Sequence, residues 1–318
     1  MEKQPINHKT LQQSVKLKDK AGAFQNFLSK LPAQISGPSM VLQNGAILFF
    51  GGRRNYIDEK NCLQLEKGNW KEHSTLNMRR IGHSAVATQT AVFVFGGYYS
   101  CMTYEYLPKD SNKWLIGKTR IPGGFDGGCA IAAKSGKEIW LIGGSDCERR
   151  ILKFNVNDHT FQSVPCHLKV KRREPRCAFI PNTNKIMITG GVRGFLVSRP
   201  EYLNSTEILD TEDGSIIMAS PMNFKRYGHG VGVVTINGVD KLAVFGGIVG
   251  SEPEFYNTQS KEWEITNVIS AVEKECFGFL TVKLADIIPH RDRKCVICAT
   301  TSKTFSEKLL EDNVCEIL

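Results

Sequence analysis

The sequence lacks a continuous apolar run near the ~20 residues that a helix needs to cross a bilayer, although 41% of its 318 residues are hydrophobic. The N-terminal segment from Met1 to Lys20 contains no apolar stretch, so we expect no secretory signal. A nucleophile elbow, a P-loop and a dinucleotide-binding motif are also missing. These absences lead us to expect a protein of the cytoplasm or the nucleus, with no membrane span, no enzymatic activity and no cofactor.

Grouped metal ligands are missing as well. The ten cysteines are spread singly along the chain, apart from a C-x-x-C pair formed by Cys295 and Cys298. A zinc site would need a second pair of ligands at suitable spacing. We therefore expect no metal site, and free thiols in a reducing compartment.

A repeat dominates what the sequence does contain. Five short apolar segments each run into a pair of glycines, at residues 46–52, 91–97, 139–144, 186–191 and 242–247. The interval from one pair to the next is nearly constant over the first four pairs and somewhat longer before the fifth. It lies in or near the period of roughly 40 to 50 residues that is typical of stacked or radial repeats.

Each repeat predicts four short strands. The apolar segment suits a strand buried on both faces, and glycine ends it because glycine adopts a positive φ without a Cβ clash. A shorter strand and then a large aromatic residue follow, at positions 70, 114, 161 and 263. Four such strands, hydrogen-bonded in order, make one propeller blade. The residues to which we assign structural roles are Gly51, Gly52, Gly96, Gly97, Gly143, Gly144, Gly190, Gly191, Gly246, Gly247, Trp70, Trp114 and Trp263.

In these features the sequence resembles the kelch repeat. That family's blade has two glycines after the second strand, a tyrosine in the third and a tryptophan at the start of the fourth. Tyr104 matches the tyrosine, and Trp114 matches the tryptophan. The resemblance covers nearly the whole chain, but a sixth unit carries Cys298 and Ala299 where the glycines are expected. The resemblance implies an all-β, six-bladed kelch propeller with four antiparallel strands per blade.

The two ends of the chain suggest how the ring closes. After Ala299 only the segment 300–318 remains, which is enough for a third strand and not for a fourth. Because an open ring would expose two sheet edges, we expect residues 23–32 to supply the outer strand of the sixth blade. This interpretation divides the chain into an N-terminal extension at 1–20 and a propeller at 21–318.

The formal net charge of +9, from 41 basic and 32 acidic residues, raises nucleic-acid binding as an alternative. The densest basic run, KVKRREPR at 169–176, is interpreted as a solvated loop between two blades, with a nuclear-import signal or a phosphate-binding patch as the alternatives. Aromatic residues do not interleave with these charges as a stacking platform requires. Nucleic acid is therefore not the expected partner.

Two histidines occupy matching positions in different repeats. His83 and His229 each follow a glycine just before a predicted first strand. Some kelch propellers are oxidases that use tyrosine, histidine and cysteine together, so a metal-ligand role is the alternative. The repetition favours a structural role, a buried hydrogen bond near the axis.

We expect the function to lie in loops, because a propeller's strands form the scaffold. The loops that follow each glycine pair and those that precede each first strand share one face. Arginines and tyrosines there can bind a carboxylate bidentately while burying apolar area, so we expect a protein partner with an acidic loop or tail. The predicted partner-binding residues are Arg53, Asn55, Arg79, Arg80, Tyr98, Tyr99, Arg176, Arg193 and Arg226.

This arrangement is similar to the kelch domains of ubiquitin-ligase adaptors, where Arg53, Asn55 and Arg80 match three pocket positions. The resemblance implies a substrate-recognition module that works with a cullin-ligase component. Such adaptors also carry a BTB domain, which the short extension at 1–20 could not hold; the chain acts alone or belongs to a longer protein. A stand-alone scaffold that binds actin is the second hypothesis, and an oxidase-like enzyme is the third.

Overall fold

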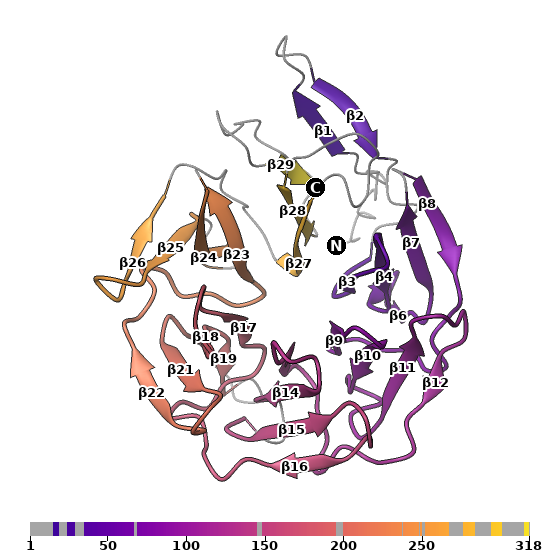
Figure 1. Cartoon of the computed structure of the whole chain (residues 1–318), viewed down its shortest axis with the longest axis horizontal. Helices are drawn as coiled ribbons and strands as arrows, with labels where there is room; N and C mark the ends of the chain where they lie inside the picture. The colour runs from indigo at the N-terminus through magenta and orange to yellow at the C-terminus, as the bar shows by residue number, and fades with distance from the viewer. Residues whose placement is uncertain are drawn as a thin grey trace, which may run out of the picture.

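The structure is a computed structural model, and the regular elements of its described residues are all β-strands (Figure 1). It describes residues 35–66, 69–144, 148–194, 200–236, 238–247, 249 and 252–266, and the backbone of β1 (Val15–Lys18), β2 (Phe24–Leu28), β27 (Cys276–Lys283), β28 (Lys294–Thr300) and β29 (Cys315–Ile317). Among the residues so described, no helix has the length and apolar character to cross a membrane.

Five antiparallel sheets of four strands follow one another along the chain and form five blades. They are β3 (Ser39–Gln43), β4 (Ala46–Phe50), β7 (Cys62–Glu66) and β8 (Asn69–His73); β9 (Ser84–Ala87), β10 (Ala91–Phe95), β11 (Tyr104–Pro108) and β12 (Leu115–Ile116); β13 (Cys129–Ala132), β14 (Glu138–Ile142), β15 (Ile151–Asn155) and β16 (Phe161–Ser163); β17 (Arg176–Phe179), β18 (Lys185–Thr189), β21 (Thr206–Asp210) and β22 (Ile216–Ala219); and β23 (Gly230–Ile236), β24 (Val239–Phe245), β25 (Glu254–Asn257) and β26 (Glu262–Ile265). Two hairpins, β5–β6 (Arg53–Arg54, Ile57–Asp58) and β19–β20 (Val192–Arg193, Glu201–Tyr202), project from the first and fourth blades.

The blades are arranged around an axis, with the first strand of each blade innermost (Figure 1). The inner strands lie side by side in the order β3, β9, β13, β17 and β23, and β27 lies beside both β23 and β3. The chain therefore forms a β-propeller.

The prediction of six four-stranded blades is wrong, because within the described residues the sixth sheet has three strands, β27, β28 and β29. β29 pairs with β28 in parallel, whereas the third strand of every other blade is antiparallel to the second. The missing glycines explain the difference. In the second blade β10 ends at Phe95, directly before Gly96, but β28 continues through Cys298 and Ala299 to Thr300. Without residues that favour positive φ, the strand has no turn at this point.

The predicted closing segment pairs differently from the expectation. β2, which covers residues 24–28, forms a two-stranded sheet with β1 and does not extend the sheet of β27, β28 and β29. β1 lies beside β29, so the hairpin is near the sixth sheet. Residues 1–14, 19–23 and 29–34 lie outside the described residues, so the extension at 1–20 and the closing role of residues 23–32 stay predictions.

The hydrophobic cores lie between neighbouring blades. The second strands β4 and β10 are buried at every position, as expected for strands covered on both faces. One cluster joins blades two and three through Phe93, Phe95 and Phe154, and another joins blades one and two, where the Trp114 ring packs edge-on against Phe50. Each blade is therefore stabilised mainly by its neighbours, as repeat architectures require.

The glycine pairs bring adjacent blades into close backbone contact. All ten glycines of the five pairs have positive φ, from 55° at Gly190 to 113° at Gly144. The second glycine of the pair donates its N–H to the next blade: Gly52 N to Arg80 O at 2.8 Å and Gly97 N to Phe125 O at 2.9 Å. A Cβ at Gly96 would lie 1.6 Å from Phe125 O, so only glycine fits there.

The expectation of free thiols is wrong for two cysteines. Cys129 and Cys177 form a disulfide that joins the inner strands β13 and β17 of blades three and four. Their sequence separation of 48 residues is close to one repeat, which places them near each other on neighbouring inner strands. Cys62, Cys101 and Cys166 are free thiols.

Candidate functional site

Two of the arginines predicted to bind a partner are buried in ion pairs within their own blades. Arg80 and Arg226 are 1% and 0% exposed, so the prediction that they line the binding face is wrong. Arg80 Nε donates to Glu105 Oε1 at 3.0 Å, and Arg226 Nη2 donates to Glu254 Oε1 at 2.8 Å. Each arginine precedes an inner strand, and its glutamate lies on the third strand of the same blade.

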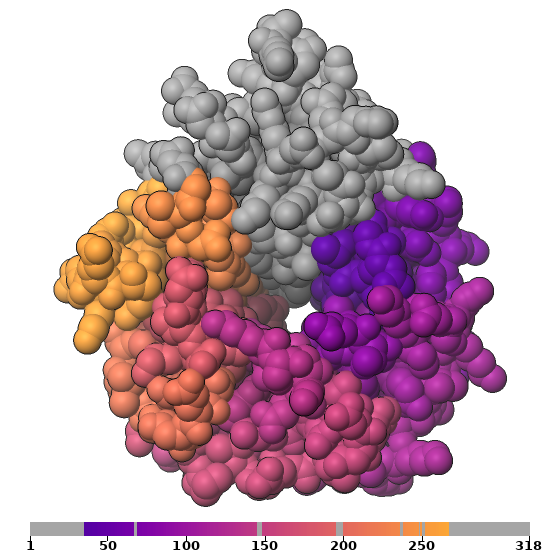
Figure 2. All heavy atoms as spheres, viewed as in Figure 1, coloured from indigo at the N-terminus to yellow at the C-terminus, as the bar shows by residue number. Residues whose placement is uncertain are grey.

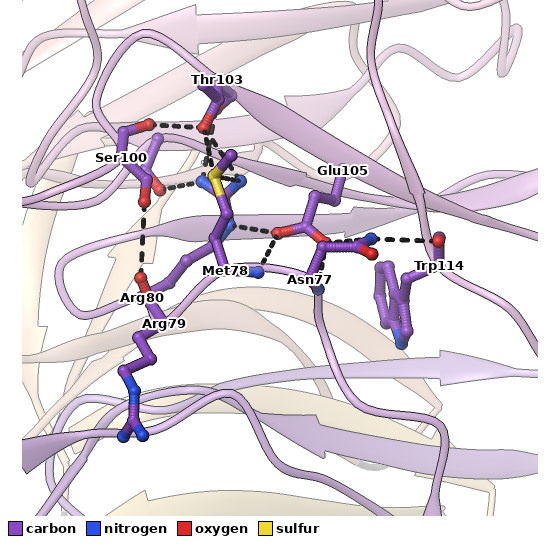
Figure 3. A network of polar contacts seen from close by, with 9 residues as sticks. Asn77, Met78, Arg79, Arg80, Ser100, Thr103, Glu105 and Trp114 are labelled. Atoms are coloured by element: carbon purple, nitrogen blue, oxygen red, sulfur yellow. Dashed lines mark hydrogen bonds and ion pairs between the residues drawn. The ribbon is translucent and has the colours of Figure 1, made fainter.

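The network around Glu105 supplies hydrogen-bond partners for both buried charges (Figure 3). The carboxylate also accepts the backbone N–H groups of Asn77 at 2.6 Å and Met78 at 3.1 Å. Arg80 Nη1 donates to the carbonyl of Gly96, the first glycine of the blade's pair. Every strong donor and acceptor finds a partner, as buried charges require. Burial lowers the pKa of the Arg80 guanidinium, and the charge of Glu105 opposes that shift.

A third pair of this kind lies in the basic run that we interpreted as a solvated loop. Arg172 is fully buried, and its Nη2 donates to Glu207 at 2.8 Å. The sequence carried a signal for all three pairs, since an arginine stands four residues before the first strand and a glutamate at the first or second position of the third strand. In blade three the corresponding residues are Phe125 and Leu152, both buried in one apolar cluster.

The loops after the glycine pairs and before the inner strands surround a central cavity of about 540 Å³, and we call this side of the ring the loop face. The space-filling view shows a hollow at the middle of the ring (Figure 2). Of the predicted residues, Arg53, Tyr98, Tyr99 and Arg176 line this cavity. The cavity is also lined by Asp126 and Arg173, from the loops before the inner strands, and by Glu174 and Tyr227, which the sequence analysis did not single out.

A second cavity of about 460 Å³ lies beside the first on the loop face. Arg53 and Tyr99 line both cavities, so the two form one continuous surface. Arg79 and Tyr56 line the second cavity and not the first. Arg193 lines neither cavity; it belongs to the β19–β20 hairpin of blade four and pairs with Glu201.

Two of the four arginines that line these cavities already have carboxylate partners. Arg53 Nε lies 2.6 Å from Asp58 Oδ1, and this hydrogen bond raises the pKa of Arg53. Arg173 Nη2 lies 2.8 Å from Asp126 Oδ2. Two predicted arginines differ: Arg79 donates to the backbone carbonyl of Asp58 and Arg176 to that of His229, and neither forms an ion pair within the part of the chain that the structure describes.

The β5–β6 hairpin carries an unusual turn. Arg54 pairs with Ile57, which leaves Asn55 and Tyr56 as the two turn residues, with φ of 49° and 65°. A two-residue turn with both φ positive favours Asn followed by Gly, so tyrosine at the second position costs about 1–2 kcal/mol. Tyr56 is 90% exposed at the tip. The predicted residue Asn55 helps to form this turn and lines neither cavity.

The two matching histidines are both buried, and the expected hydrogen bond is present at His229. His229 is fully buried, and its Nε2 lies 2.8 Å from Thr189 Oγ1. Burial lowers the pKa of His83 to about 3 and that of His229 well below its usual value, so both are neutral at pH 7. Within the described residues, no group of three or more histidine, cysteine, aspartate or glutamate side chains is placed to hold a metal ion.

These features define the class of the protein as a β-propeller of repeated blades with a hollow loop face. Comparison of the sequence with family models and with curated proteins gave no match.

Proposed function

We propose that this propeller is a protein-binding module that captures its partner on the loop face. As the finer assignment, we propose that its blades are kelch repeats and that it recognises substrates for ubiquitin transfer. The glycine pairs, Tyr104 and Trp114 support the kelch assignment. We propose binding rather than catalysis because the sequence offers no nucleophile or cofactor motif.

The exposed tyrosines carry the proposal. Tyr56 is held at a hairpin tip in a backbone conformation that disfavours tyrosine, and such strain is concentrated at functional sites. Tyr98 and Tyr99 are 57% and 75% exposed in the loop after the next glycine pair, with ring centroids 4.7 Å apart. Tyrosine anchors are enriched among the residues that dominate binding energy at protein interfaces.

The charges around these tyrosines favour an acidic partner. The guanidinium groups of Arg79 and Arg176 donate to backbone carbonyls and not to carboxylates. They can therefore bind a partner's carboxylate without first losing an ion pair. Arg53 would have to exchange its bond to Asp58. We therefore expect Arg79 and Arg176 to contribute more than Arg53, and binding to weaken as salt screens the charges.

The test is affinity capture with the full chain, followed by mass spectrometry, for the wild type, Tyr56→Gly and Tyr99→Ala. Tyr56→Gly is informative because glycine suits the turn: we expect stability to be unchanged or higher while partner recovery falls about tenfold. Ile217→Ala is the control, since Ile217 is exposed on the outer strand β22, away from both cavities. Unchanged recovery with both tyrosine variants would exclude this surface.

The captured proteins also decide between the two binding hypotheses. Recovery of cullin-ligase components with a second protein that depends on Tyr56 supports substrate recognition. Cosedimentation of the purified chain with filamentous actin, lost in Tyr56→Gly, would instead support a cytoskeletal scaffold.

A further inference from the structure

The first residue of four inner strands, β3, β9, β13 and β17, makes a contact across to the next blade. In three junctions the contact is a single hydrogen bond: Ser39 Oγ with His83 O at 3.5 Å, Ser84 Oγ with Ala130 N at 2.9 Å, and Arg176 Nε with His229 O at 3.0 Å. These junctions join blades one to two, two to three and four to five. At this position of the inner strand, three junctions are therefore linked without a covalent bond.

The junction between blades three and four is covalent. Cys129 occupies the same position as Ser39, Ser84 and Arg176, the first of its strand, and its disulfide partner Cys177 occupies the position of Ala130. Because the equivalent junctions hold without a covalent bond, the fold does not require this disulfide.

The disulfide faces a cavity. Cys129 and Cys177 line a space of about 150 Å³ between the inner strands, together with His83, Arg176 and His229. This space shares His83, Gly128 and Arg176 with the 540 Å³ cavity of the loop face. A small molecule that enters from the loop face therefore approaches the disulfide.

The positive charge in this space favours the binding of a small anion. Arg176 precedes Cys177 in the chain and is charged, whereas His83 and His229 are neutral at pH 7 because burial lowers the pKa of each. A positive charge near a cysteine attracts a thiolate and stabilises the cysteine thiolate that departs. Both effects favour thiol–disulfide exchange.

Blades three and four also supply residues that line the loop-face cavity. Arg173 pairs with Asp126 at 2.8 Å, and Glu174 N donates to Gly127 O at 2.5 Å, so the loop before Cys177 is tied to the loop before Cys129. Relaxing the junction between β13 and β17 would loosen these contacts.

We propose that the Cys129–Cys177 pair is a thiol-exchange site for small anionic thiols, and that its redox state sets the mobility of residues 173–176 at the cavity mouth. A thiolate attacks one sulfur, the S–S bond breaks, and the departing cysteine thiolate takes a proton from water. A second small thiolate then attacks the small-molecule sulfur of the mixed disulfide. The remaining cysteine departs as a thiolate and takes a proton from water, which leaves two cysteine thiols and one small-molecule disulfide. The proposal does not depend on the identity of the protein partner.

The test uses the full chain purified without reductant and treated with glutathione in the absence of denaturant. Peptide mapping after alkylation should show Cys129 linked to Cys177 before treatment and both alkylated after it. Cys62 is an internal control, because burial raises the pKa of its thiol to about 12 and it should stay unmodified. Hydrogen exchange at residues 173–176 should quicken several-fold on reduction, with blade two unchanged.

The matched variant is Cys129→Ser with Cys177→Ala, which reproduces the Ser84–Ala130 junction. It should fold, exchange at residues 173–176 as the reduced wild type does, and not respond to glutathione. Failure of this variant to fold would overturn the proposal, because the covalent bond would then be required by the fold. Reduction only under denaturing conditions, no linkage before treatment, or unchanged exchange on reduction would each overturn it as well.

Discussion

A single residue in this propeller can contact both the preceding blade and its own blade. The backbone oxygen of Arg80 accepts a hydrogen bond from Gly52 of the preceding blade, while its side chain pairs with Glu105 of its own blade. Blade three keeps the backbone contact through Phe125 and replaces the ion pair with Phe125 and Leu152. It also has Pro122 where blade two has Asn77, so one of the two backbone N–H groups that Glu105 accepts in blade two has no counterpart there.

The first prediction concerns this ion pair. Glu105→Leu leaves the Arg80 charge buried and unpaired, and should lower the free energy of unfolding by about 3–5 kcal/mol. Arg80→Phe combined with Glu105→Leu imitates blade three and should recover part of that loss. Urea unfolding measures both. Glu66→Gln is the control, because the exposed pair of Glu66 and Lys71 should contribute at most about 1 kcal/mol. A double variant as unstable as the sum of the single variants would contradict this account.

The second prediction concerns pH. Burial holds the pKa of His83 at about 3 and that of His229 well below 6.5, whereas both would titrate near 6.5 in the unfolded chain. The unfolded state therefore binds more protons below about pH 6.5, so stability is complete above that pH and falls as acid is added. Melting temperatures between about pH 7 and about pH 5 test this, above the range where carboxylates titrate. His229→Gln should weaken the dependence; an identical slope in that variant would rule out His229 as a source.

At the scale of elements, the glycine pair decides where the second strand of each blade ends. Two features can require glycine at such a position. One is a positive φ, and the other is the close approach of the next blade. Gly96 meets both, since its φ is 65° and Phe125 O occupies the space of a Cβ. Gly136 has a similar φ of 68° in a turn between β13 and β14, with no atom within 4 Å of the Cβ position.

The third prediction separates these two requirements. Gly136→Ala should cost about 1–2 kcal/mol, the penalty of a left-handed conformation in a residue with a side chain. Gly96→Ala carries the same penalty and must also displace the backbone at Phe125, so it should be considerably more destabilising. Thermal and urea unfolding of the two variants give the comparison. Equal losses would mean that backbone conformation is the whole reason for glycine at position 96.

At the scale of the whole molecule, the ring is built from units of two different kinds. Five blades share interlocked cores, whereas the sixth position is occupied by a three-stranded sheet beside the β1–β2 hairpin. The inner strand β27 lies between β23 and β3, so the sixth sheet connects the last complete blade to the first.

The fourth prediction follows from this arrangement. Deletion of residues 1–30 removes β1 and β2, and with them the contact of β1 with β29. We expect a lower melting temperature and aggregation, because sheet edges near the sixth position become exposed. Light scattering and calorimetry on the deletion and the full chain test this. A soluble deletion that melts at the temperature of the full chain would show that the hairpin does not contribute to closure.

The sequence by itself determined the propeller, the positions of the second strands and the need for glycine after each, because apolar periodicity and positive φ are properties of the local chain. Arg53, Tyr98, Tyr99 and Arg176, which the sequence assigned to one face, line one cavity, and their role in partner binding stays a prediction. Only the tertiary structure decided which arginines are available. Arg79 and Arg80 are neighbours in the sequence, yet one is exposed and the other is paired with Glu105. Burial of Arg80 depends on residues such as Glu105, 25 positions away, that the fold brings near, and the same long-range proximity joins Cys129 to Cys177.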